Sequence, residues 1–153
     1  MNGIFAIKPE AVSLIESGSK DEILDDLSGL FAQAWGLERT LVLEHLIERE
    51  RLGSTGFGRG VAIPHARFPD IRRPIAAFAK LARPVAFEAA DGMPVDLVFG
   101  LLSPDNSGVT HLHALAAVSR LVRDDRMHEA LTEAPDADAL YGLIANVTDR
   151  DAA

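Results

Sequence analysis

The first third of the chain has apolar residues at helical spacing. Over residues 23–34 they recur every three or four positions and form one stripe. Ser19 precedes this stripe and Glu22 follows three positions later, a capping-box pattern in which each side chain satisfies the other residue's free backbone N–H. Gly36 ends the periodic run, and a second helix is predicted over about Arg39–Arg51.

The middle of the chain has the shorter apolar runs of strands. Four closely spaced glycines in residues 53–60 are typical of a loop. A short strand is predicted over 61–63, where the next residue is a proline that stops it, and a longer one over 75–81. Residues 95–102 are almost continuously apolar, and a turn is predicted over 103–108. Such a run indicates a strand that helices cover on both faces.

The last third returns to helical spacing. A helix is predicted from Thr110, and Asp136 stands where it can cap a final helix. No repeat or linker divides the chain, and only a few residues at its start and residues 149–153 fall outside the predicted elements. Helices, then strands, then helices predict an α/β sandwich, with one domain over residues 1–153 and an ordered core at about 4–147.

Composition and charge narrow the class of partner. The 153 residues are 48% hydrophobic and 25% charged, the balance of a globular domain with a real core. The formal net charge is −8 and the isoelectric point is about 5.0. A surface that binds nucleic acid needs clustered Lys and Arg, so no nucleic-acid partner is expected. An acidic domain more naturally meets a protein partner.

Several kinds of site are excluded by what the sequence lacks. It has no cysteine, no His-x-x-x-His pair, no P-loop and no dinucleotide-binding fingerprint, so neither a metal nor a cofactor is expected. No apolar run approaches the roughly 20 residues that span a bilayer, and the first residues lack the features of a signal peptide. We expect a cytoplasmic domain with no membrane insertion.

Two of the five histidines stand at positions suited to chemistry. His65 follows the predicted strand 61–63, at a strand end where sheet proteins place reactive groups, although such a histidine can also be structural. His111 faces inward near the positive end of the helix that follows the buried strand. It is either a satisfied core histidine or a second imidazole beside His65. The other three are expected to be exposed or to have packing roles: His45, His113 and His128.

Two arginines precede the glycine-rich loop. Arg49 or Arg51 could hold a phosphate through two parallel hydrogen bonds, which a lysine cannot do. The same stretch, residues 48–51, alternates in the sign of its charges, which is typical of a solvated helix face. The residues alone leave both interpretations open and favour the second.

Five blocks of sequence, in a fixed order along the chain, are similar to those of a known family. They are LIERERLGSTG at 46–56, GVAIPH at 60–65, PVAF at 84–87, DGMPVDLVFGLL at 91–102 and HLHALA at 111–116. These blocks resemble the enzyme IIA domain of the fructose/mannitol/nitrogen-regulatory class of the bacterial phosphotransferase system (PTS), and the nitrogen-regulatory branch most closely. The resemblance extends from about Lys20 to Val147.

The resemblance implies a fold and a site. The fold is a mixed central sheet flanked by helices. His65 is the phosphorylated histidine, through its Nε2 atom, Arg49 holds the phosphoryl group, and His111 lines the site. The family often has glycine after the active histidine, where this chain has Ala66, so the backbone there can differ.

The resemblance also implies partners. The implied donor is the small phosphocarrier HPr or its nitrogen-branch relative, and we expect it to dock on a shallow apolar patch around His65 to which Phe57 and Phe68 contribute. Three functions stay open at this point: a regulatory carrier that controls a target protein by its phosphorylation state, a transport IIA that passes phosphate to a IIB domain, and a binding module that is never phosphorylated.

Overall fold

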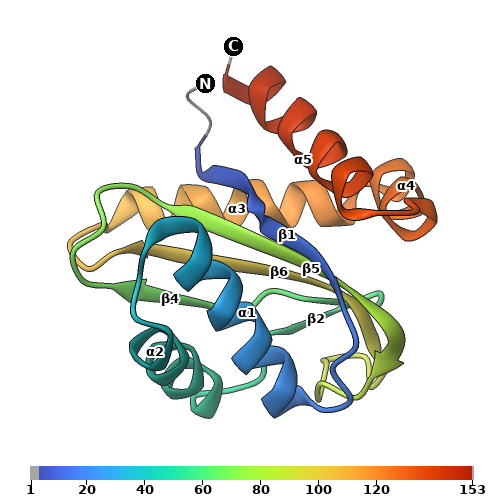
Figure 1. Ribbon diagram of the computed structural model, residues 1–153, viewed down its shortest axis with the longest axis horizontal. Coiled ribbons are helices and arrows are strands. Elements are labelled where there is room, and N and C mark those ends of the chain that lie inside the picture. The colour runs from blue at the N-terminus through green and yellow to red at the C-terminus, as the bar shows by residue number, and fades with distance from the viewer. Residues whose placement is uncertain (1–3, 153) are drawn as a thin grey trace.

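The computed structural model describes residues 4–152 of the chain, with side chains through residue 147 (Figure 1). The elements, in chain order, are β1 Ala6–Ile15, α1 Lys20–Trp35, α2 Arg39–Arg51, β2 Gly56–Gly58, β3 Val61–Ala62, β4 His65–Phe68, β5 Ile75–Val85, β6 Val95–Pro104, α3 Val109–Arg123, α4 Asp125–Glu133 and α5 Ala137–Ala152. This α/β content is the class that the sequence predicted.

The described strands form one six-stranded mixed sheet, as the resemblance implied. Its order is β1-β5-β6-β3-β2, and β4 pairs with β6 beyond the end of β3. The β1/β5, β3/β6 and β4/β6 pairs are parallel, whereas β5/β6 and β2/β3 are antiparallel. Strand β6 therefore lies in the interior of the sheet.

Helices cover both faces of this sheet, and each face has its own apolar core. Helices α1 and α2 lie on one face and α3, α4 and α5 on the other (Figure 1). In β6, Val98 and Leu102 belong to the first core, while Phe99 and Leu101 belong to the second. The prediction that residues 95–102 are buried on both faces is thus confirmed.

The predicted helix signals are present with one change. Ser19 Oγ accepts a hydrogen bond from the Glu22 N–H at 3.2 Å, but the Glu22 carboxylate reaches the Gly18 N–H at 2.6 Å and not that of Ser19. Gly36 ends α1 with φ of 68°, a left-handed conformation that favours glycine. At the other end of the chain, Asp136 Oδ1 accepts from the Ala139 N–H at 2.9 Å, so Asp136 caps α5 as predicted.

Four elements were not predicted: β1 and α4, and the short strands β2 and β4. Strand β1 contains Lys8, Pro9 and Glu10, and these exposed residues hide the period of a strand at the sheet edge. Helix α4 is short and mostly polar, and Asp124 caps it through the Met127 N–H at 3.0 Å.

Several boundaries also differ from the predictions. Pro64 interrupts the strand pairing for two residues only, because the pairing with β6 that ends at Ala62 in β3 resumes at His65 in β4. Strand β5 continues to Val85, β6 extends through the first two residues of the predicted 103–108 turn, and the glycine-rich loop contains β2. Helix α5 runs to Ala152, so it includes most of residues 149–153. Residues 1–3 and 153 lie outside the described part.

Candidate functional site

The three residues singled out by the sequence line one hollow of about 540 Å³. Arg49 comes from the last turn of α2, His65 from the start of β4, and His111 from the first turn of α3. The sheet brings them together because β4 lies alongside β6, and β6 leads directly into α3. The remaining lining residues are His45, Glu48, Leu52, Ala66, Arg67 and Asp105.

His65 is held so that one ring nitrogen faces the hollow with a lone pair. Its Nδ1 lies 2.7 Å from the carbonyl oxygen of Ile63. A carbonyl can only accept, so Nδ1 has the proton and Nε2 is the basic nitrogen. His65 is half-buried and begins β4, so it lies within a strand and not after the end of one as predicted.

The environment of His65 favours the neutral ring. Burial is the largest cause that lowers its pKa, and the Arg49 charge lowers it further. The Ile63 hydrogen bond and the Glu50 charge raise it in part. The net pKa is below the ordinary value of 6.5. At neutral pH the imidazole is therefore a nucleophile.

His111 faces His65 from the other side of the hollow. The two ring centroids are 5.9 Å apart, and His111 is only 6% exposed. Burial, followed by the charges of Arg67 and His65, lowers the pKa of His111 to about 4. Its Nδ1 is 2.6 Å from the hydroxyl of Ser103. His111 is thus both a buried, hydrogen-bonded histidine and a neighbour of His65, so the two alternatives of the sequence analysis coexist.

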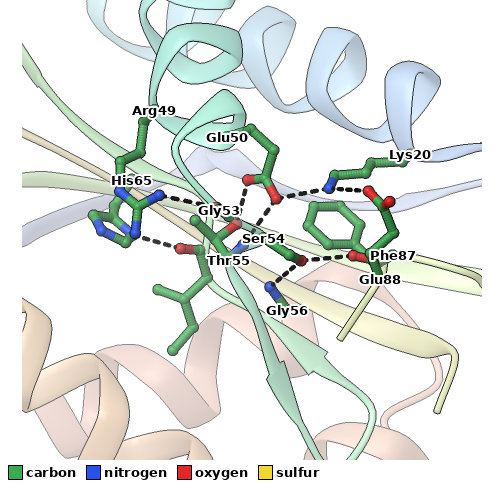
Figure 2. A network of polar contacts seen from close by, with 11 residues as sticks. Lys20, Arg49, Glu50, Gly53, Ser54, Thr55, Gly56, His65, Phe87 and Glu88 are labelled. Carbon is green, nitrogen blue, oxygen red and sulfur yellow. Dashed lines mark hydrogen bonds and ion pairs between the residues drawn. The ribbon is translucent and has the colours of Figure 1, made fainter. Parts of the chain in front are cut away.

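Arg49 is fixed at the opening of the hollow. Its Nη1 donates to the carbonyl oxygen of Gly53 at 3.0 Å, across the turn that follows α2 (Figure 2). The rest of the guanidinium lines the hollow with His65. The alternating stretch 48–51 is therefore more than a solvated face, since Arg49 belongs to the site.

Glu50, the next residue, points to the opposite side and is buried, with 7% of its side chain exposed. Its carboxylate accepts from the backbone N–H of Thr55 at 2.8 Å and from the Thr55 hydroxyl at 2.6 Å. Lys20 pairs with it at 2.8 Å and also contacts Glu88 at 2.8 Å (Figure 2). These contacts fasten the loop after α2 to the beginning of α1.

Hydrogen bonds to backbone carbonyls connect this loop to His65. The Thr55 carbonyl accepts from the Ile63 N–H at 2.9 Å, and the Ile63 carbonyl accepts from His65 Nδ1. Glu50 therefore holds the loop whose peptide groups orient both Arg49 and His65. This role could not be predicted from sequence, because Glu50 belongs to a run of alternating charges that is typical of an exposed helix face.

Arg67 is a second guanidinium at the hollow, which the sequence analysis missed. It is exposed, and its Nε donates to the Ser107 carbonyl at 3.3 Å. It stands two residues after His65 in β4, so both side chains project from the same face of the strand. A prediction of β4 would have revealed it.

Of the two phenylalanines expected to contribute to an apolar patch, one is buried and one is half-buried. Phe68 is buried and packs against His45 at 5.1 Å between ring centroids, so it does not contribute to a surface. Phe57 is half-buried against the second core. Leu52, which lines the hollow, is 83% exposed, and Val109 and Leu112, which flank His111 in the first turn of α3, are 63% and 61% exposed.

The other histidines agree with their expected places. His113 is exposed, and His128 is partly buried with its Nε2 at 2.8 Å from the Arg59 carbonyl. Within residues 4–152, no three His, Asp or Glu side chains gather as a metal site would require. In the same part of the chain, no helix has both the length and the apolarity to cross a membrane.

Comparison with known proteins gives consistent matches. The family model "Phosphoenolpyruvate-dependent sugar phosphotransferase system, EIIA 2" matches residues 6–147. A nitrogen regulatory protein of Bradyrhizobium diazoefficiens is 42% identical over 140 residues, which are 91% of this chain and 92% of that protein. A fructose-specific PTS EIIA component of Haloferax volcanii is 34% identical and covers 92% of both chains.

A solved structure agrees with these sequence matches. The crystal structure of the nitrogen regulatory protein IIA-Ntr from Neisseria meningitidis superposes with a TM-score of 0.82 and 34% identity, covering 90% of this chain and 95% of that one. The resemblance seen in the sequence is thereby confirmed. The chain belongs to the EIIA family of the phosphoenolpyruvate-dependent sugar phosphotransferase system.

Proposed function

We propose that this chain, as one domain, is a cytoplasmic phosphoryl carrier that accepts a phosphoryl group on Nε2 of His65. The observation that supports this most directly is the Nδ1 contact to the Ile63 carbonyl at 2.7 Å, because it leaves Nε2 as the free nucleophile. The lowered pKa of His65 keeps that nitrogen unprotonated at neutral pH. Membership in the EIIA family points to the same chemistry.

The transfer is a displacement between two histidines. Nε2 of His65 attacks the phosphorus of a phosphohistidine on the donor, a new N–P bond forms, and the electron pair of the old N–P bond returns to the donor imidazole. No proton has to move, because His65 keeps the proton on Nδ1 and the donor ring keeps the proton on its other nitrogen, so that it leaves as a neutral imidazole. The two bonds have similar energies, so the transfer is reversible.

The side chains around His65 stabilise the charge that gathers on the equatorial oxygens. Arg49 is placed to hydrogen-bond these oxygens through the guanidinium N–H groups that Gly53 does not use. Arg67 adds a second positive charge from the other side of the hollow. Donors that are already in place act without reorganisation during the reaction, which is the main means of catalysis in phosphoryl transfer.

The donor that suits this surface is a small phosphocarrier of the HPr type, from either the sugar or the nitrogen branch. Leu52 and Leu112 are exposed apolar side chains near the hollow, and Val109 adds a third. An apolar rim around a charged centre suits a transient protein partner, which must align two nitrogens in line with the phosphorus.

Two downstream roles have support. The relatives named nitrogen regulatory protein favour a regulatory carrier whose phosphorylation state controls a target protein. The fructose-specific EIIA component favours transfer to a IIB domain in sugar transport. The binding module that is never phosphorylated has less support, because His65 and its surrounding cations are arranged for transfer.

The deciding experiment is transfer of labelled phosphate from phosphoenolpyruvate through enzyme I and HPr, or through their nitrogen-branch counterparts. We expect acid-labile, base-stable label on the wild type and none on the His65→Ala variant. His113→Ala is the matched control, since that histidine is exposed, and it should label normally. Absence of label on the wild type with both donor branches would leave the binding module as the function. Loss of the label on addition of a IIB domain would identify a transport role.

A further inference from the structure

A buried hydroxyl contacts the second histidine of the site. Ser103 lies near the end of β6 and is fully buried, and its Oγ is 2.6 Å from Nδ1 of His111 on α3. His111 itself is 6% exposed. The contact crosses from the sheet to the helix that covers it, at the edge of the hollow.

The direction of this hydrogen bond follows from what each group can do. A serine hydroxyl has one proton to donate, whereas a neutral imidazole has one donor and one acceptor nitrogen. Among the described residues, His111 Nδ1 is the only hydrogen-bond partner found for the Ser103 hydroxyl. If Nδ1 donated to Oγ, the buried hydroxyl proton would have no acceptor, which costs free energy. The hydroxyl therefore donates to Nδ1.

This direction determines where His111 has its proton. With a pKa of about 4 the ring is neutral near pH 7, so only one nitrogen is protonated. Since Nδ1 accepts from Ser103, the proton is on Nε2. The ring then presents an N–H donor on the side away from Ser103, where the hollow lies.

The two histidines are consequently in opposite states. Nδ1 of His65 donates to a carbonyl, which leaves a lone pair on Nε2. Nδ1 of His111 accepts from a hydroxyl, which leaves a proton on Nε2. One ring is prepared to form the bond to phosphorus, and the other is prepared to donate a hydrogen bond to a phosphoryl oxygen.

We infer that Ser103 is a positioning residue that fixes His111 as an Nε2–H donor to the phosphoryl group on His65. This inference rests on the proposed function for its purpose but not for its geometry. Without the hydroxyl, His111 can place its proton on Nδ1 and turn a lone pair toward the phosphoryl oxygens, which would repel them.

The geometry is tested on the unphosphorylated protein. Long-range ¹H–¹⁵N spectra of the imidazoles distinguish a protonated from an unprotonated ring nitrogen. For wild type at pH 7 we expect His111 with Nε2 protonated and Nδ1 unprotonated, and in Ser103→Ala a shift of the Nδ1 resonance as its donor is lost. Ser28→Ala removes another fully buried hydroxyl, which donates to the Leu24 carbonyl at 2.8 Å, and should leave His111 unchanged. A proton on Nδ1 in the wild type, or an unchanged spectrum in Ser103→Ala, would overturn the inference.

The role in transfer is tested by rates. Ser103→Ala should slow labelling about tenfold, and in a His111→Gln background it should add less than about twofold, because both changes remove the same hydrogen bond. Independent, additive effects of the two changes would mean that Ser103 acts on stability only. Failure of the wild type to label would sink the proposed function, whereas the imidazole spectra would still decide the state of His111.

Discussion

The hollow has one wall at the end of α2 and another at the start of α3, and different kinds of contact hold the side chains of each in place. On the α2 wall, Arg49 is charged and lies at the opening, and the buried carboxylate of its neighbour Glu50 pairs at 2.8 Å with Lys20, which is half-buried. On the α3 wall, His111 and Ser103 are neutral and buried, and one hydrogen bond joins them. Both walls face the same nucleophile, His65.

The difference reflects what each wall has to supply. A full positive charge is costly to bury, so Arg49 stays near solvent and is positioned indirectly, through a loop that Glu50 fastens. A neutral donor can be buried at low cost once its other nitrogen is satisfied, and Ser103 satisfies it for His111. We therefore expect changes on the α2 wall to act through charge, and those on the α3 wall through proton placement.

The largest effect is expected from the charge at the opening. Arg49→Ala should slow phosphoryl transfer to His65 by about 10²–10³-fold, the usual loss when one fixed donor to a developing oxyanion is removed. His65 remains available as the acceptor, so label should still accumulate slowly. The measurement is the initial rate of labelling from a phosphorylated HPr-type donor.

Arg51→Ala is the matched control for Arg49→Ala. Arg51 is exposed in the same helical turn and does not line the hollow, so its removal should change the rate less than about twofold. Equal slowing by both variants would mean that the overall charge of the α2 terminus matters for donor docking, and that Arg49 has no special contact with the phosphoryl group.

The next largest effect is expected when the Glu50 contacts that hold the α2 wall are removed. Glu50→Ala leaves the N–H and the hydroxyl of the buried Thr55 without their acceptor and Lys20 with Glu88 alone, and should lower the free energy of unfolding by about 3 kcal/mol. Glu48→Ala changes an exposed carboxylate on the same helix and should cost less than about 0.5 kcal/mol. Urea unfolding of both variants measures the difference.

The outcome for Glu50→Ala also tests the connection to the site. The Thr55 carbonyl accepts a hydrogen bond from the Ile63 N–H, and the Ile63 carbonyl accepts one from His65. Because Glu50→Ala removes the contacts that hold Thr55, it should slow phosphoryl transfer even under conditions where the variant is fully folded. A variant that unfolds at the same urea concentration as Glu48→Ala would show that the ion pair does not fasten this wall.

These two walls also show what sequence could predict. Helix α1, with its apolar period, and strand β6, with its continuous apolar run, were predicted because burial itself imposes these patterns. Strand β1 and helix α4 were missed because their exposed faces are polar and their partners lie elsewhere in the chain. Local pattern cannot report a partner that is distant in sequence.

The residues of the site also divide into those that sequence could predict and those that it could not. His65, Arg49 and His111 were found because sequence blocks around them resemble a known family. Glu50 and Ser103 were missed because their roles depend on long-range contacts. In the sequence, Glu50 belongs to a stretch typical of an exposed charged face, and only the fold brings Lys20 against it. Ser103 was predicted in a turn, whereas β6 extends through it and places it against His111 of α3.

The smallest effect we expect is the pH dependence of stability due to the α3 wall. The pKa of His111 is about 4 in the folded protein, where Arg67 and His65 are the charged or titratable groups acting on it, and about 6.5 in the unfolded chain. Between these values the unfolded state binds a proton that the folded state does not. Stability attributable to His111 is therefore present above pH 6.5 and falls as the pH approaches 4, with a loss of about 2 kcal/mol between pH 7.5 and pH 5.

His111→Gln should remove this part of the pH dependence in urea unfolding, and His113→Gln, which changes an exposed histidine two residues away, should retain it. Parallel stability profiles for wild type and His111→Gln would mean that the pKa of His111 is the same in the folded and the unfolded chain, and that the α3 wall does not favour the neutral ring.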